Sequence, residues 1–178
     1  MKILAIVGMA GSGKSVLSGY LRAKGFPVLR LGEFVMEEVE RRGLPITPEN
    51  ERFVREDLRR QHGMDVCAQL ALPVIRAAQA ELFVIDGLYS FSEYKTFRRE
   101  FGDRLVVVAV FTSRPLRYQR LAVRVERPLT AEEAQRRDEV EIERIEKGGP
   151  IALADYTLLN DGAPDDLTRQ AEALLKLL

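Results

Sequence analysis

The sequence predicts an α/β protein built around a parallel sheet. Five short runs rich in Val, Ile and Leu recur along the 178 residues, and stretches with helical patterning separate them. Strands that alternate with helices pack as a parallel sheet covered on both faces. The length suits one domain spanning residues 1–178, with a substantial hydrophobic core. The predicted strands are residues 3–7, 27–31, 82–86, 105–111 and 156–160.

Capping residues mark the helices between these strands. Thr47 followed by Pro48 predicts a helix start, and His62-Gly63 predicts its end. Further signals are the capping-box pairs Ser90/Glu93 and Thr130/Glu133, a capping Asp65, a Gly148-Gly149-Pro150 stop for the helix that begins at Thr130, and an amphipathic C-terminal run over 165–178.

Charge and composition restrict the possible partners. The chain carries 27 basic and 27 acidic residues, so no net field draws it to nucleic acid or to an anionic membrane. The longest apolar run, residues 105–111, is far shorter than the roughly 20 residues that span a bilayer. The single cysteine, Cys67, cannot form an internal disulfide and favours a reduced, cytoplasmic setting. We therefore expect local anion binding and no membrane partner.

Residues 8–15 read GMAGSGKS directly after the first predicted strand and match the pattern G-x-x-x-x-G-K-[ST]. Amide groups at a helix N-terminus bind polyphosphate, and glycines allow the backbone to approach it closely. In this pattern the lysine reaches the β- and γ-phosphates, while the hydroxyl ligates Mg²⁺. The predicted ligands of ATP and Mg²⁺ are Gly8, Met9, Ala10, Gly11, Ser12, Gly13, Lys14 and Ser15.

A second candidate group is Asp86, at the carboxyl end of the predicted strand 82–86. Ligands of open α/β sheets bind at this edge. An acid there can hold Mg²⁺, usually through water, or orient the attacking group. The structural alternative is that Asp86 caps the turn before Gly87.

Arginines concentrate in a predicted lid over residues 114–147. Between positions 112 and 137 seven arginines stand against three acids, Glu126, Glu132 and Glu133. Such a cluster can stabilise the charge of a transferred phosphoryl group and exclude water. Since 21 of the 27 basic residues are arginines, a solvated charged face is the alternative. The candidates are Arg120 and Arg124, which share a predicted helix face with Arg127, and Arg136 and Arg137 on the next helix.

At these motifs the chain resembles the P-loop nucleotide and nucleoside monophosphate kinases, which include adenylate, cytidylate and dephospho-CoA kinases. The segments RREFGD, RRDEVE and IALADYTLLNDG are most similar to a small, uncharacterised kinase-like subfamily. The resemblance implies a three-layer fold with five parallel strands, acceptor-binding helices over about 32–80 and a small helical lid. It also implies that Asp86 lies near the metal and acceptor, that Arg120, Arg124 and Arg136 or Arg137 approach the phosphates, and that NDGAP lies against adenine.

The acceptor site departs from the pattern of these kinases. Met36 and Ser90 stand where monophosphate kinases usually carry phosphate-binding arginines. Glu33 occupies the neighbourhood of the general base that dephospho-CoA kinases use, although an acid is also favourable in the first turn of a helix. Residues that can replace the missing arginines are Arg30, Arg55 and Arg59.

The leading functional hypothesis is an ATP- and Mg²⁺-dependent kinase that acts on a small nucleotide-like acceptor, with a nucleoside monophosphate ahead of dephospho-CoA. A nucleotide-binding regulator or slow NTPase is the alternative from another class, and the missing acceptor arginines motivate it. A nucleic-acid-directed kinase is a third reading that the zero net charge weakens. The sequence leaves open a monomer or a homodimer.

Overall fold

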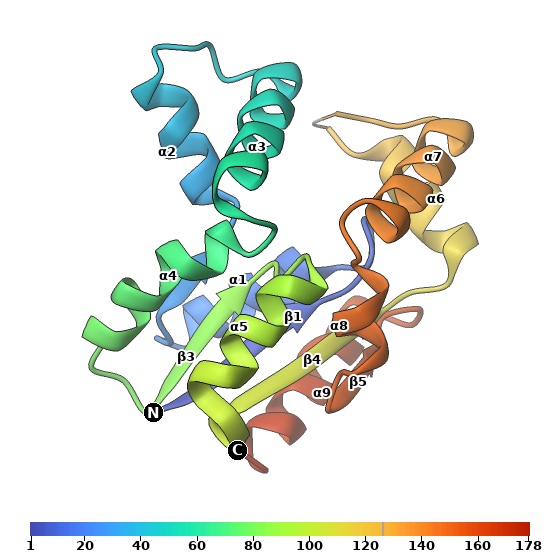
Figure 1. Ribbon diagram of the computed structural model, residues 1–178. Coiled ribbons are helices and arrows are strands. Elements are labelled where there is room, and N and C mark those ends of the chain that lie inside the picture. Colours follow the sequence, from blue (N-terminus) through green and yellow to red (C-terminus); the bar gives the residue numbers. More distant parts are fainter. Residues whose placement is uncertain (126) are drawn as a thin grey trace.

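The computed structural model describes residues 1–125 and 127–178 and contains the predicted sheet of five parallel strands (Figure 1). The strand order is β2-β3-β1-β4-β5. The strands are β1 (Lys2–Val7), β2 (Val28–Arg30), β3 (Leu82–Asp86), β4 (Leu105–Phe111) and β5 (Tyr156–Leu159). Because all five are parallel, their carboxyl ends meet at one edge of the sheet.

Helices cover both faces of the sheet, and two further pairs of helices lie beyond its carboxyl edge (Figure 1). The helices are α1 (Lys14–Ala23), α2 (Glu33–Arg41), α3 (Pro48–His62), α4 (Val66–Ala77), α5 (Phe91–Phe101), α6 (Arg114–Val123), α7 (Ala131–Glu143), α8 (Gly148–Ala152) and α9 (Pro164–Leu175), with a 3₁₀ turn at Gly102–Arg104.

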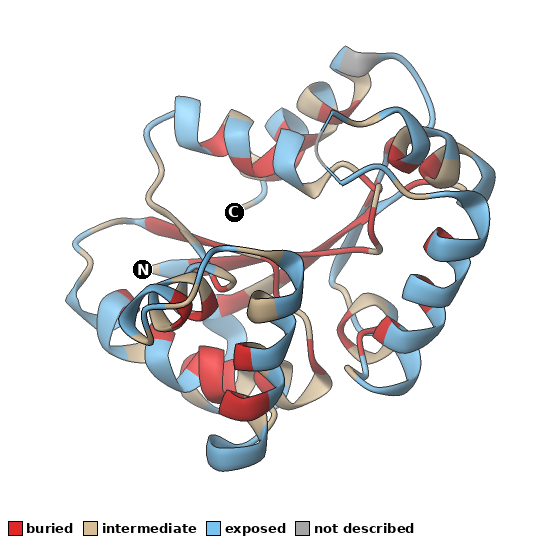
Figure 2. Ribbon diagram, turned by 90° about the horizontal axis from the view of Figure 1, so that it is seen from above, coloured by how far each residue is buried: buried red, intermediate tan, exposed pale blue. Residues whose placement is uncertain are grey.

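The core divides into two layers because successive side chains of a strand point to opposite faces of the sheet. Ile3 and Ala5 of β1 pack in a cluster with buried residues of α4 and α5. Leu4 and Ile6 pack in a second cluster with residues of α1 and α9. Figure 2 shows the buried residues along the strands and on the helix faces turned toward them. The three-layer arrangement predicted from the sequence is confirmed.

The two helix pairs beyond the sheet flank its carboxyl edge (Figure 1). On one side stand α2 and α3, and on the other stand α6 and α7, which occupy the predicted lid. A small cluster of Ala10, Leu121 and Ala134 packs the α6–α7 pair against the loop that follows β1. Glu126, one of the three acids counted in the lid, lies outside the described residues.

Three predicted helix starts are confirmed by their hydrogen bonds. Thr47 Oγ1 accepts the Asn50 N–H at 3.2 Å. The other two, at Ser90/Glu93 and Thr130/Glu133, form complete capping boxes at the starts of α5 and α7.

Three local expectations need correction. Asp65 precedes α4, but its side chain does not cap the helix, because its carboxylate accepts hydrogen bonds from Thr96 Oγ1 at 2.6 Å and Gln69 Nε2 at 2.9 Å. The helix that Thr130 begins ends at Glu143, before the Gly-Gly-Pro segment, which opens α8 instead. Finally, α6 ends at Val123, so Arg120, Arg124 and Arg127 do not share one helix face.

Within the described residues, no helix is both long enough and apolar enough to cross a membrane. The one cysteine, Cys67, is buried in α4, and this burial raises the pKa of its thiol to about 12.

The two capping boxes allow a test of how burial changes the contribution of a capping residue to stability. Ser90 is fully buried and its hydroxyl also donates to the carbonyl of Met64 at 3.2 Å, whereas Thr130 is exposed. We expect Ser90→Ala to lower the free energy of unfolding by about 2 kcal/mol and Thr130→Ala by about 1 kcal/mol. Urea titration followed by circular dichroism measures both. Equal losses would show that burial adds nothing to the Ser90 cap.

Candidate functional site

The predicted phosphate-binding loop, residues 8–15, connects β1 to α1 at the carboxyl edge of the sheet. The Lys14 ammonium lies across the loop and donates to the carbonyls of Gly8 at 2.8 Å and Met9 at 3.0 Å. The amides of Lys14 and Ser15 belong to the first turn of α1, where a helix offers no internal acceptor. The loop therefore presents N–H groups and one cation to the same space, which suits a polyphosphate.

Two glycines of the loop are required by close contacts. Gly8 has φ 144°, and a Cβ there would lie 2.5 Å from the carbonyl oxygen of Val110. Gly13 has φ 99°, and its Cβ would lie 2.1 Å from the Asn160 side-chain nitrogen. Larger residues at either position would both strain the backbone and collide with the neighbouring strand ends.

The ends of β4 and β5 hold the loop in place. The carbonyl of Ser12 accepts hydrogen bonds from Thr112 Oγ1 at 3.0 Å and Asn160 Nδ2 at 2.8 Å. Arg120 in turn donates to Thr112 Oγ1 at 3.2 Å and to the Asn160 carbonyl at 2.8 Å. This predicted lid arginine therefore braces the two strand ends that support the loop.

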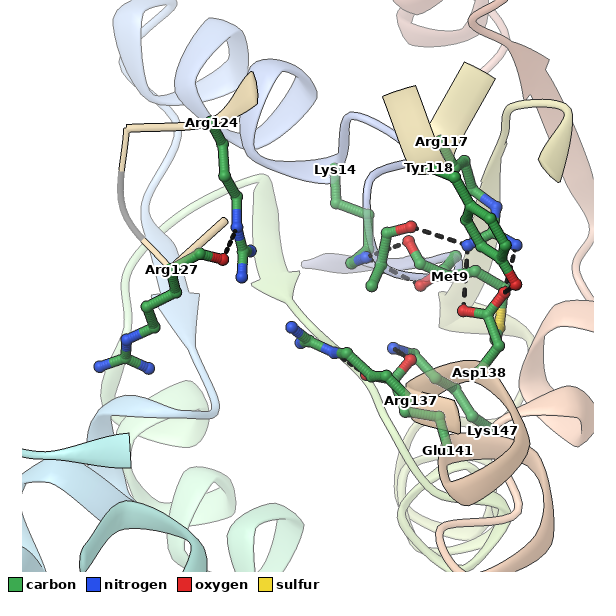
Figure 3. Close-up of polar contacts among 12 residues, drawn as sticks. Met9, Lys14, Arg117, Tyr118, Arg124, Arg127, Arg137, Asp138, Glu141 and Lys147 are labelled. Carbon is green, nitrogen blue, oxygen red and sulfur yellow. Dashed lines mark hydrogen bonds and ion pairs between the residues drawn. The ribbon is translucent and has the colours of Figure 1, made fainter. Parts of the chain in front are cut away.

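Arg117 of α6 connects the loop to the lid. It forms a bidentate ion pair with Asp138 of α7, at 3.0 and 2.5 Å, and donates to the carbonyl of Ala10 at 2.9 Å (Figure 3). Both side chains are buried. A charge in the protein interior is tolerated when it is paired and hydrogen-bonded, as these two charges are. The contact positions α7 beside the phosphate-binding loop.

One turn further along α7, Glu141 binds two cations. Its carboxylate accepts from Arg137 Nε at 3.0 Å and from Lys147 Nζ at 2.6 Å. Figure 3 shows both cations on the side of α7 that faces Lys14. The Lys147 ammonium also lies 4.9 Å from the ring centre of Tyr89, which folds back over Gly87.

Burial and neighbouring charges lower the pKa of Lys14 to about 7. Desolvation is the main cause and the nearby Lys147 charge is the next, while Glu141 and Asp86 act in the opposite direction. A polyphosphate beside this ammonium would favour its charged form. The site is therefore electrostatically suited to a bound anion, in addition to the Glu141 and Asp86 carboxylates.

Ser15 and Asp86 fit a magnesium ion. The hydroxyl of Ser15 is exposed at the start of α1. Asp86 accepts a hydrogen bond from Ser18 Oγ at 3.0 Å through Oδ2, and in the described part of the chain no hydrogen bond engages its other oxygen. No group of three acidic, His or Cys ligands occurs among the described residues. Mg²⁺ is usually held by one or two protein groups together with substrate phosphates and water, so one hydroxyl and one carboxylate would be enough ligands from the protein.

The candidate acceptor residues lie across the carboxyl edge from the lid. Arg30 ends β2 and pairs in register with Asp86 of β3, and Glu33 is the exposed first residue of α2. Arg55 and Arg59 stand one turn apart on α3. Burial and the Arg59 charge lower the pKa of Arg55, and the buried Nε of Arg59 has no hydrogen-bond partner in residues 1–125 and 127–178.

The remaining lid candidates occupy different places. Arg136 is exposed on α7. Arg124 follows α6 and donates to the carbonyl of Arg127, which itself pairs with Glu51 of α3 at 2.6 Å. Arg127, which lies between α6 and α7, therefore links the lid to α3 on the acceptor side.

Sequence reasoning missed four charged residues of the site: Arg117, Asp138, Glu141 and Lys147. The spacing offered one usable signal, since Glu141 lies four residues after Arg137 and so shares its helix face. The position of Lys147 depends on the path of the chain after α7. The Arg117–Asp138 pair depends on how α6 crosses α7. Neither of these is encoded in a short motif.

Comparisons with known proteins agree with this geometry. Residues 7–146 match a family model described as an AAA domain. A UPF0200 protein of Thermococcus gammatolerans is 38% identical over 98% of this chain and 94% of its own length, and one of Thermococcus kodakarensis is 38% identical over 97% and 96%.

Solved structures share the fold. TT1252 from Thermus thermophilus superposes with a TM-score of 0.69 at 24% identity, covering 99% of this chain and 97% of that one. A gluconokinase from Sinorhizobium meliloti gives 0.60 at 18%, with 99% and 93% covered, and a shikimate kinase from Bacteroides thetaiotaomicron gives 0.64 at 14%, with 99% and 97% covered. The chain has the fold of the P-loop kinases, and it belongs to the family that the AAA-domain model describes and to the UPF0200 proteins.

Proposed function

We propose that the protein is a kinase that transfers the γ-phosphoryl group of ATP, with Mg²⁺, to a small nucleotide-like acceptor. The observation that carries the proposal is the convergence of Lys14, Arg137 and Lys147 on the space in front of the phosphate-binding loop. Solved structures of the same fold are named as kinases of gluconate and shikimate.

In this proposal the loop amides and Lys14 hold the polyphosphate, and Arg137 approaches it from α7. Phosphoryl transfer needs little covalent help from the protein, so positioning and charge stabilisation supply most of the rate. Ser15 and Asp86 would hold Mg²⁺, which would supply positive charge that offsets the charge of the phosphates. Ala10, Leu121 and Ala134 pack α6 and α7 against the loop, and in this proposal the lid limits the access of water to the reacting groups.

For the acceptor we propose a nucleoside monophosphate whose phosphate is bound by Arg55 and Arg59, with Arg30 nearby. Two like charges one turn apart repel each other, and desolvation adds to that cost. The other arginines of α3 differ, because Arg52 pairs with Glu56 at 2.9 Å and Arg60 pairs with Asp57. Within the described residues no salt bridge engages Arg55 or Arg59, although the Arg59 charge also acts on the buried Glu93 carboxylate. An anionic group on the acceptor would give these arginines a direct partner. Ser90 is not available for this role, since its hydroxyl caps α5.

Replacing Lys14 by Met tests the nucleotide site. We expect transfer to fall by about 10²–10³-fold, because a cation that stabilises the transferred group is lost. The nucleotide-free variant should be at least as stable as the wild type, since it no longer buries a desolvated ammonium. Following ADP release and thermal melting measures both effects. Lys24→Met, at the exposed position that follows α1, is the control. Normal turnover in Lys14→Met would refute the proposal.

The α3 arginines allow a matched test of the acceptor site. We expect Arg55→Met and Arg59→Met each to raise the KM for the monophosphate by roughly 10–100-fold, the size of a charge-assisted contact, with the KM for ATP unchanged. Arg52→Met and Arg60→Met remove arginines from the same helix and should change neither constant. A screen of nucleoside monophosphates that follows product mass identifies the acceptor first. A rise in the KM for ATP alone would contradict this assignment.

A second candidate is transfer to a hydroxyl, as in dephospho-CoA kinases, and it is favoured by the exposed Glu33 carboxylate at the start of α2. A hydroxyl acceptor needs a base, whereas a phosphate acceptor hardly does. Glu33→Gln should therefore lower kcat by about 10²-fold or more with dephospho-CoA and leave transfer to a monophosphate nearly unchanged. Tight ATP binding without any phosphorylated product would instead favour the nucleotide-binding regulator.

A further inference from the structure

Lys147 is the most deeply buried cation of the described residues. It follows α7 and immediately precedes α8, and only 1% of its surface is exposed. The backbone before it turns sharply, because Glu146 has φ 58° and the Lys147 N–H donates to the carbonyl of Glu141 at 3.1 Å. This turn directs the side chain back toward the phosphate-binding loop (Figure 3).

The ion pair with Glu141 does not balance the charge around Lys147. Glu141 is shared with Arg137, and the Lys147 ammonium is near enough to Lys14 for its charge to oppose the charged form of Lys14. Asp138 also acts on Lys147, but it forms a buried pair with Arg117. Among the described residues of the site, four cations therefore stand against three carboxylates, and the Tyr89 ring covers one side of Lys147. Burying a surplus cation is unfavourable unless an anion completes the set.

Lys147 and Lys14 lie on opposite sides of the space in front of the phosphate-binding loop. Lys14 and the loop amides lie on the β1–α1 side of the space in front of the loop, whereas Lys147 lies on the α7–α8 side. An anion between the two ammonium groups would extend away from the loop. In a nucleotide whose inner phosphates rest on the loop, the terminal phosphate is the one that extends in this way.

We propose that Lys147 is a catalytic residue that contacts the terminal phosphate of a nucleoside triphosphate, with Glu141 holding its ammonium in place. This inference rests on the proposed function. In the transfer step the bond between the γ-phosphorus and the β,γ-bridging oxygen breaks, and its electron pair leaves with the diphosphate. The bond from an acceptor oxygen to the same phosphorus forms. Lys147 stabilises the negative charge on the oxygens of the group in transit.

If Lys147 contacts the terminal phosphate, it should strengthen the binding of a nucleoside triphosphate much more than that of a diphosphate. Lys147→Met keeps the length of the side chain and removes its charge. We expect it to weaken binding of the β,γ-imido analogue of ATP by about 10–100-fold, the size of one charge-assisted contact, and binding of ADP by less than about threefold. Calorimetry with Mg²⁺ measures both affinities. Lys147→Arg should restore most of the preference for the triphosphate.

The control is Lys95→Met, since Lys95 is exposed and also lies over an aromatic ring, 5.0 Å from the centre of Phe91. If Lys147→Met does not fold, the double variant Lys147→Met/Glu141→Gln removes both buried charges and is measured in the same way. Equal weakening of both nucleotides, or of neither, would overturn the role of Lys147. If the wild type binds no triphosphate, the proposed function fails with it, so the two failures are distinguishable.

Discussion

The candidate site depends on the contacts of Arg117. Its guanidinium binds Asp138 of α7 in a bidentate pair and donates to the carbonyl of Ala10 in the phosphate-binding loop. A rigid, planar donor can satisfy two partners from different segments at once, which a lysine could not do with the same geometry. Because the pair is buried, loss of either partner would leave an uncompensated charge. The placement of Arg137, Glu141 and Lys147 follows from this junction.

Some polar groups of the site are held by hydrogen bonds within the protein, and others lack such partners among the described residues. The carbonyl of Ser12 is held by Thr112 and Asn160, which Arg120 braces in turn, although the buried Ser12 hydroxyl has no partner among the described residues. In contrast, Lys14 has a lowered pKa and Arg59 has a buried nitrogen without a partner among the described residues. Functional sites commonly carry such unfavourable electrostatics, which bound substrates relieve. The two unsatisfied regions coincide with the expected positions of nucleotide and acceptor.

The fold and the loop were predictable from sequence because their signals are local. Strand periodicity, capping boxes and the G-x-x-x-x-G-K-S pattern all act within a few residues, and each is found where predicted. The lid was predicted less well. Helix periodicity placed Arg124 and Arg127 on α6, but the helix ends at Val123, where no Gly or Pro signals the end. The Arg117–Asp138 and Lys147–Glu141 pairs required knowledge of how α6, α7 and α8 pack.

The buried Cys67 gives the chain a practical property. Thiol reagents attack the thiolate, and a cysteine that stays protonated and covered by α4 and its neighbours reacts slowly. A dye that reacts with thiols should therefore label cysteines introduced on the surface much faster than it labels Cys67. One dye on α3 and another on α7 would report the separation of the two sides of the carboxyl edge by energy transfer, without first removing a native thiol.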